Sequence, residues 1–242
     1  MIKDKDIFNI INKEKYQKNG IIGVFTRRNI STKISLILSK TEISPNQITL
    51  LSFLLGILGI FFLSTGQRIN LIFAGILIFL SKIFDAVDGE VARLKKMETK
   101  KGGWLDGISD RFKENLLFLG IALGLYNQTG EVIVWYYSFI AIISIHMLSI
   151  VLEHTGQMDK NALQNSHSDF WLVKIAKKLG IKPQYLALQA DTYLFITYTL
   201  IILNKLMLIL WFFMIFMNLY WIMIVIIIFR KKEKINRELI KR

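Results

Sequence analysis

Residues 85–110 read DAVDGEVARLKKMETKKGGWLDGISD and lie inside a strongly apolar chain. The stretch carries four aspartates: Asp85, Asp88, Asp106 and Asp110. Ionisable side chains in or near membrane-spanning segments are rare and mark functional sites by default. Because residues three or four apart share one face of a helix, each half of the stretch presents a pair of carboxylates on one side. The stretch therefore predicts two helices whose acids face each other across a turn ending in Gly102-Gly103.

The rest of the sequence predicts an all-α, polytopic membrane protein. The chain has 242 residues, 53% of them hydrophobic, with 2 prolines and no cysteine. A helix needs ~20 mostly apolar residues to span a bilayer. Six stretches qualify or nearly do: Gln47–Ser64, Asn70–Phe84, Leu105–Tyr126, Val132–Leu152, Leu186–Leu203 and Leu206–Phe229. The second has no helix breaker before Gly102, which predicts a long helix that carries the first two aspartates beyond the apolar layer.

The basic residues predict the orientation of these helices. The net charge is +13, but the lysines and arginines lie between the apolar stretches instead of forming one patch, which argues against nucleic-acid binding. They concentrate near both termini, around the aspartates and between the fourth and fifth stretches, whereas the alternate loops hold only Arg68 and Lys205. By the positive-inside rule, both termini and the aspartates face the cytoplasm.

Three regions follow from this pattern. Residues 1–40 form a cytoplasmic N-terminal segment, in which Gly20–Lys40 mixes bulky apolar side chains with basic ones. Such a mixture is typical of an amphipathic helix at the membrane interface, with a plain linker as the alternative. Residues 41–230 form the six-helix domain, and residues 231–242 form a basic cytoplasmic tail.

The residue types in residues 85–110 point to phosphate chemistry. Oxygen ligands without sulfur or imidazole select magnesium, manganese or calcium, and two such ions form the usual clamp for displacement at phosphorus. Gly89 and Ala92 extend the face of the first two aspartates, so a ligand can approach the backbone there. Arg93 lies four residues after Gly89, and a guanidinium suits phosphate oxygens. Simple pairing of the aspartates with nearby lysines at a solvated helix end does not explain this regular spacing.

The spacing D-x2-D-G-x2-A-R-x8-G-x3-D-x3-D over residues 85–110 resembles the complete signature of the CDP-alcohol phosphotransferase superfamily, the enzymes of phospholipid headgroup synthesis. The run PNQIT at Pro45–Thr49 resembles the Pro-Asn-x-x-Thr run of the same family, so the resemblance covers about residues 41–230. It implies a divalent-metal-dependent transferase that moves a substituted phosphate group, of the phosphatidyl type, from a CDP-linked donor to an acceptor alcohol and releases CMP.

The resemblance also implies roles for individual residues. Two Mg²⁺ or Mn²⁺ ions would be held by Asp85, Asp88, Asp106 and Asp110, with Asp110 doubling as the catalytic general base. The CDP site would be formed by Asn46, Thr49, Asp88, Gly89, Ala92, Arg93, Thr99 and Gly102. Cationic or polar groups left for the acceptor are Lys113, His154 and Lys174. A homodimer embedded in the lipid bilayer of the cell membrane is also expected.

The sequence leaves the substrates open. One branch transfers a phosphatidyl-type group from a CDP-linked lipid to a small alcohol, and the other transfers a phospho-alcohol from a soluble CDP-alcohol. The run RRNIS at residues 27–31 is similar to the branch that makes inositol phosphodiesters from CDP-inositol. The chain has no arginine between Arg111 and Arg230, a departure from what a phosphorylated inositol acceptor is expected to need.

Two further classes remain as alternatives. A non-enzymatic, ion-binding membrane transporter also places carboxylates among membrane helices. A membrane prenyltransferase binds magnesium and pyrophosphate through two acidic motifs, but its motifs lie far apart in sequence, whereas both pairs here fall within residues 85–110.

Overall fold

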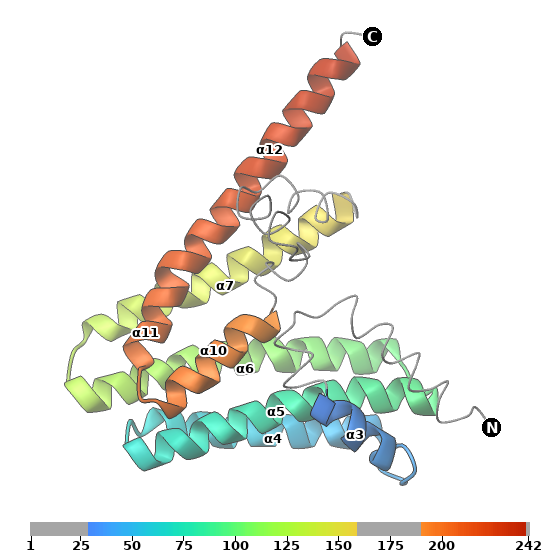
Figure 1. The fold of residues 1–242 in the computed structure, drawn as a ribbon, viewed down its shortest axis with the longest axis vertical. Coiled ribbons are helices and arrows are strands. Elements are labelled where there is room, and N and C mark those ends of the chain that lie inside the picture. Colours follow the sequence, from blue (N-terminus) through green and yellow to red (C-terminus); the bar gives the residue numbers. More distant parts are fainter. Residues whose placement is uncertain (1–28, 159–189, 241–242) are drawn as a thin grey trace, which may run out of the picture. The chain divides into compact units, whose positions relative to one another are not determined.

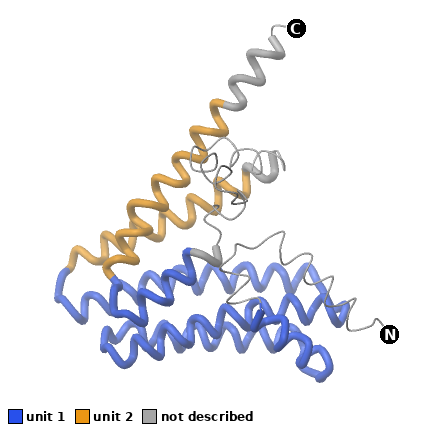
Figure 2. Tube along the Cα trace, in the orientation of Figure 1, with its two compact units in different colours: residues 1–131, 188–206 blue, residues 132–187, 207–242 orange. Residues whose placement is uncertain are grey.

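The computed structural model describes residues 29–158 and 190–240, and each regular element in these ranges is a helix (Figure 1). The all-α prediction is therefore confirmed for this part of the chain. The chain divides into two compact units (Figure 2). Of the described residues, the first unit holds 29–131 and 190–206, and the second holds 132–158 and 207–240.

The first unit is built around one long helix, α5. Its helices are α3 (Asn29–Leu38), α4 (Pro45–Ser64), α5 (Arg68–Lys95), α6 (Lys100–Thr129) and α10 (Ala190–Ile202). Helix α5 packs against α3, α4 and α10, and α4 also packs against α6 (Figure 1). The four signature aspartates therefore lie on the two helices, α5 and α6, that share α4 as a neighbour.

Glycines allow α4 to approach both of these neighbours closely. A Cβ atom at Gly59 would lie 2.8 Å from Cγ1 of Ile78 on α5. On the other side, a Cβ atom at Gly120 of α6 would lie 2.9 Å from Cγ2 of Ile60 on α4. Real Cβ contacts are not this short, so side chains at these positions would push the helices apart.

The start of α4 is well defined by its sequence. Ser44 is the N-cap, Pro45 occupies the first turn, and the side chain of Gln47 reaches back to the Ser44 backbone in a capping box. This cap fixes the PNQIT run as the first residues of α4, a helix that packs against α5.

The turn between α5 and α6 differs from the prediction. Helix α5 ends at Lys95, with Lys96 in the left-handed region at φ 56°, and α6 begins at Lys100. Thr99 is the N-cap of α6, and its hydroxyl accepts a 3.0 Å hydrogen bond from the Gly102 N–H. Gly102-Gly103 therefore lies inside the first turn of α6 and not in the connection, because the threonine cap starts the helix before the glycines are reached.

Four helical segments in the described residues are long and apolar enough to cross a membrane: Pro45–Ser64, Arg68–Lys95, Ile133–His154 and Leu206–Arg230. They overlap the predicted first, second, fourth and sixth spans. Helix α6 runs through the predicted third span but is not among the four, and its first half carries seven charged residues: Lys100, Lys101, Asp106, Asp110, Arg111, Lys113 and Glu114. Helix α10 covers part of the fifth, since Leu186–Gln189 lies outside the described residues. Six spans and a cytoplasmic site remain predictions.

Helix α3 falls within the predicted amphipathic helix, of which residues 20–28 lie outside the described part. Its buried side is polar: Ser31 and Ser35 donate hydrogen bonds of 3.0 and 2.8 Å to the carboxylate of Glu90 on α5, which is fully buried. Ile30 and Ile37 on α3 are 42% and 66% exposed. These exposed apolar side chains fit an interfacial helix, whose membrane location remains a prediction.

The second unit contains α7 (Ile133–Met158), α11 (Leu206–Trp211, which begins on the last residue of the first unit), a π-helical segment η3 (Phe212–Met217) and α12 (Asn218–Ile240). Helix α7 packs against η3 and α12. The sequence did not reveal the π-helical segment within the predicted sixth span.

Candidate metal and nucleotide site

Three of the four aspartates form a cluster in which the carboxylates of Asp85, Asp106 and Asp110 converge. One carboxylate oxygen from each lies within 4.8 Å of the others. Asp85 comes from α5, and the other two come from α6, where their spacing of four places both on one face. The helical period thus turns residues separated along the chain into one set of oxygen ligands.

The cluster fits a hard divalent cation. Its donors are all carboxylate oxygens, which magnesium and manganese prefer. Oδ1 of Asp106 is buried and accepts no hydrogen bond within the described part of the chain. Buried carboxylate oxygens normally have a partner, so this oxygen is placed as a metal ligand would be.

Asp88 has a different environment from the other three. Its Oδ2 accepts a 2.7 Å hydrogen bond from the hydroxyl of Thr49 on α4, and its Oδ1 accepts a 2.5 Å bond from the Gly89 N–H. Asp88 is 5% exposed and is not part of the three-carboxylate cluster. These contacts orient its carboxylate at the contact between α4 and α5.

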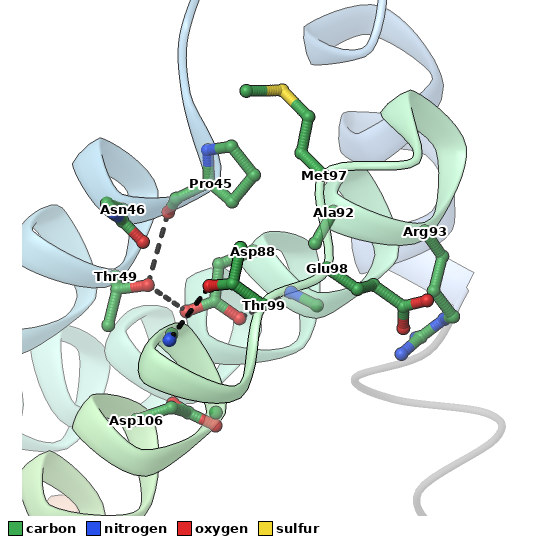
Figure 3. Close-up of a pocket in the computed structure, with 13 residues that line it drawn as sticks. Pro45, Asn46, Thr49, Asp88, Ala92, Arg93, Met97, Glu98, Thr99 and Asp106 are labelled. Atoms are coloured by element: carbon green, nitrogen blue, oxygen red, sulfur yellow. Dashed lines mark hydrogen bonds between the residues drawn. The ribbon is translucent and has the colours of Figure 1, made fainter.

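A cavity of about 240 Å³ adjoins the cluster (Figure 3). It is lined by all eight residues predicted for CDP binding, namely Asn46, Thr49, Asp88, Gly89, Ala92, Arg93, Thr99 and Gly102. Asp106 also lines it and therefore belongs to both the cavity and the carboxylate cluster. The structure thus brings the residues of the signature and of the PNQIT run around one space.

Four further lining residues were not identified from the sequence as site residues: Pro45, Met97, Glu98 and Gly103. Met97 and Glu98 lie in the connection between α5 and α6. The two acidic helices are close in sequence, which was a signal that the short connection between them lies beside the predicted site residues.

Small residues keep the cavity open. A Cβ atom at Gly89 would meet only the guanidinium nitrogens of Arg93, at 3.5 and 3.9 Å, and one at Gly103 would meet nothing within 4 Å. Gly89 is therefore not required by helix packing, in contrast to the close contact at Gly59. Its missing side chain leaves space beside Asp88 and Arg93.

Two buried lysines lie on another side of the cluster. The ammonium nitrogen of Lys82 is 2.6 Å from Oδ1 of Asp110 and 3.6 Å from Oδ2 of Asp85. That of Lys113 is 2.9 Å from Oδ1 of Asp85 and 3.2 Å from Oδ1 of Asp110. Sequence reasoning missed Lys82, although its position three residues before Asp85 in an apolar run was a usable signal.

The three acceptor candidates are not brought together in the described residues. Lys113 is buried against the cluster and does not line the 240 Å³ cavity. His154 belongs to the second unit, and Lys174 lies outside the described residues. Their role in acceptor binding remains a prediction.

Comparison with known proteins places these residues in a family. A protein of Thermococcus kodakarensis named bifunctional IPC transferase and DIPP synthase is 31% identical over 144 residues, which cover 60% of this chain and 31% of that protein. A protein of the same name from Archaeoglobus fulgidus is 40% identical over 114 residues, 47% of this chain and 22% of that protein.

The archaetidylinositol phosphate synthase of Pyrococcus horikoshii is 34% identical over 119 residues, 48% of this chain and 57% of that protein. The chain spans less than a third of the length of the first two relatives. The family model described as CDP-alcohol phosphatidyltransferase matches residues 42–189, a range that includes the aspartates and the cavity. The chain therefore belongs to the CDP-alcohol phosphatidyltransferase family.

Proposed function

We propose that this chain is a membrane-embedded phosphotransferase that transfers a substituted phosphate group from a CDP-linked donor to an acceptor alcohol and releases CMP. The observation that carries the proposal is the position of Asp106, which both lines the cavity and belongs to the carboxylate cluster. A nucleotide in that cavity would have its pyrophosphate next to the only cluster of three carboxylates found in the described residues.

The aspartates would hold divalent Mg²⁺ or Mn²⁺, which supplies positive charge to the phosphate oxygens when bound. Arg93 would contact the pyrophosphate, since a guanidinium offers paired donors to phosphate oxygens. Asn46 and Thr49 would close the nucleotide site from α4, and the space left by Gly89 would admit the ligand to the backbone.

Asp110 would accept the proton of the attacking hydroxyl. Its side chain is 32% exposed, in contrast to the 11% of Asp85, so it is the more accessible carboxylate for a second substrate. Because a carboxylate is a weak base for an alcohol, positioning of the hydroxyl has to provide much of the rate.

Two substrate branches are supported by different observations. The four apolar helices fit an enzyme that handles a CDP-linked lipid and transfers a phosphatidyl-type group in phospholipid synthesis. The relatives named IPC transferase and DIPP synthase favour the second branch, in which an inositol phosphodiester is formed from soluble CDP-inositol. Two other relatives are named as synthases of archaetidylinositol phosphate and phosphatidylinositol phosphate. Because of these names, a phosphorylated inositol remains a candidate acceptor, although the chain has no arginine between Arg111 and Arg230.

The membrane arrangement is part of the proposal. The active site would face the cytoplasm, and the chain would act as a homodimer. A site at the cytoplasmic edge of the bilayer would allow a water-soluble substrate to meet a substrate that is held in the lipid.

The substrates can be identified by offering donors and acceptors separately. Purified protein would be incubated with a CDP-linked diacyl lipid or with CDP-inositol, each combined in turn with inositol, inositol phosphate or no acceptor. Mass spectrometry would then identify the products. One combination of donor and acceptor should give a phosphodiester product together with CMP. If inositol phosphate is the acceptor, the product also carries its phosphomonoester. Absence of any acceptor-dependent product across the set would favour the transporter alternative.

A further inference from the structure

Two lysines are built into the carboxylate cluster at depth. Lys82 and Lys113 are 9% and 6% exposed, and both ammonium groups contact Asp85 and Asp110. Buried ammonium groups are tolerated only where carboxylates or hydrogen bonds compensate them. The two lysines and the two aspartates therefore form one mutually compensating group.

The position of Lys113 is shaped by its surroundings. Its ammonium group also donates a 3.2 Å hydrogen bond to the hydroxyl of Ser52 on α4. A Cβ atom at Gly56, one turn further along α4, would lie 3.1 Å from Cδ of Lys113 and 2.9 Å from Oγ of Ser81. The glycine thus leaves room for the lysine stem, so the lysine is packed in place and does not reach the aspartates from solvent.

Asp106 takes part in this group only at longer range, through the attraction between its carboxylate and the two ammonium groups. It makes no ion pair with a lysine or arginine in residues 29–158 and 190–240, and its buried Oδ1 has no hydrogen-bond partner there. The cluster is therefore uneven: two carboxylates face ammonium groups, and the third faces the nucleotide cavity.

The charges suggest how many metal ions this arrangement accepts. Two ammonium groups carry the same charge as one divalent ion. We propose that Lys82 and Lys113 take the place of one of the two metal ions implied by the family resemblance, so that the cluster binds a single divalent ion next to Asp106. A second divalent ion would have to displace an ammonium group or bind beside two of them, where repulsion opposes it.

The space around the lysines also argues for this role and against direct binding of a second substrate. Both lysines line a separate, partly open cavity of about 30 Å³, whose exposed wall consists mostly of apolar atoms from α4, α5, α6 and α10. A space of that size holds about one water molecule and excludes a polyol. Their accessible contacts are thus the carboxylates.

Manganese binding tests the proposal without any turnover. The purified full chain in detergent would be titrated with Mn²⁺, and free Mn²⁺ would be followed by its electron paramagnetic resonance signal. We expect one tightly bound ion per chain, lost in Asp106→Asn. In the Lys82→Met/Lys113→Met double variant, the aspartates lose both ammonium partners, and we expect two bound ions per chain.

Two control variants separate this effect from charge in general. Lys82→Arg keeps the positive charge at the cluster and should retain one ion. Lys205→Met removes a positive charge at an exposed position in the turn after α10 and should also leave the count at one. Circular dichroism and gel filtration would show which variants are folded.

Two tight ions in the unmodified chain would overturn the proposal, and so would a folded double variant that binds only one. The number of ions bound by the unmodified chain decides between one ion and two even if the double variant fails to fold. The inference rests on the proposed function, because that function makes the carboxylate cluster a metal site. The experiments can nevertheless refute the metal count and the proposed function independently of each other. Two bound ions with CMP release would leave the function standing, and one bound ion without CMP release would refute the function alone.

Discussion

The hydroxyl of Thr49 on α4 lies 2.7 Å from Oδ2 of Asp88 on α5, so two helices that border the cavity meet at one signature carboxylate. The same hydroxyl oxygen lies 3.1 Å from the backbone carbonyl of Pro45, one turn earlier in α4 (Figure 3). The PNQIT run and the aspartate signature are therefore parts of one structure, although 39 positions separate the two residues in the chain.

Removal of the Thr49 hydroxyl should weaken nucleotide binding. Thr49→Val keeps the shape of the side chain but leaves Asp88 without one of its two donors, so its carboxylate is less well oriented toward the cavity. A hydrogen bond to a charged group contributes ~1.5–3 kcal/mol, and we expect CDP affinity to fall about tenfold or more. Calorimetric titration with CDP and Mg²⁺ measures this. Thr49→Ser should bind nearly as well as the unmodified chain, and equal affinity of Thr49→Val would show that the contact has no part in binding.

A side chain at position 89 should fill the nucleotide cavity. Gly89→Leu introduces no charge, and a Cβ atom there meets only the Arg93 guanidinium, so the helix packing should persist. We expect loss of measurable CDP binding in the same titration. Gly107→Leu on α6 is a matched control, because Gly107 is exposed, has nothing within 4 Å of a Cβ atom and does not line the cavity. If both leucine variants bound CDP normally, the cavity would not be the nucleotide site.

Arg93 should act on the donor and not on the acceptor. Arg93→Gln removes the charged fork while keeping a polar side chain, and loss of a charge-assisted phosphate contact corresponds to ~1–3 kcal/mol. We expect the KM for a CDP-linked donor to rise about tenfold to hundredfold, with little change in that for the acceptor. Arg111→Gln is the comparison, since Arg111 pairs with Glu114 at 2.8 Å on α6 and does not line the cavity. A change confined to the acceptor KM would reassign Arg93.

Glu90 should hold α3 against α5. Glu90→Ala would leave the hydroxyls of Ser31 and Ser35 without this acceptor, and a buried polar group that loses its partner costs ~1–3 kcal/mol. We expect a lower melting temperature in detergent and faster proteolysis near α3. Glu90→Gln, which keeps an acceptor oxygen, should be affected less, and the exposed Glu42→Ala should melt like the unmodified chain. Equal melting temperatures for the unmodified chain and its three variants would show that Glu90 does not stabilise the packing of α3 against α5.

The helical period explains how much of the site could be predicted from the sequence. Asp85, Asp88, Gly89 and Ala92 recur at intervals of three or four, so any helix through them places them on one side. The structure accordingly gathers the predicted nucleotide residues around one cavity. Their binding roles came from the family resemblance and await experiment.

The missed features depend on contacts between segments far apart in the chain. Glu90 meets Ser31 and Ser35 across 59 and 55 positions, and Lys82 meets Asp110 across 28. No local pattern reports such pairs, and Lys82 was hidden within an apolar run. The position of the turn was missed for another reason: the glycines at 102–103 were given more weight as breakers than the Thr99 cap that precedes them.

The central claim is that this chain transfers a phosphate group from a CDP-linked donor by means of its metal-binding aspartates. The most direct measurement is CMP release from the donor by the purified chain in Mg²⁺, compared with the same reaction in chelator and with Asp106→Asn. We expect acceptor-dependent CMP release that disappears in chelator, returns on addition of Mg²⁺ or Mn²⁺, and is absent in the folded Asp106→Asn variant. Undiminished CMP release in chelator, or in that variant, would contradict the account.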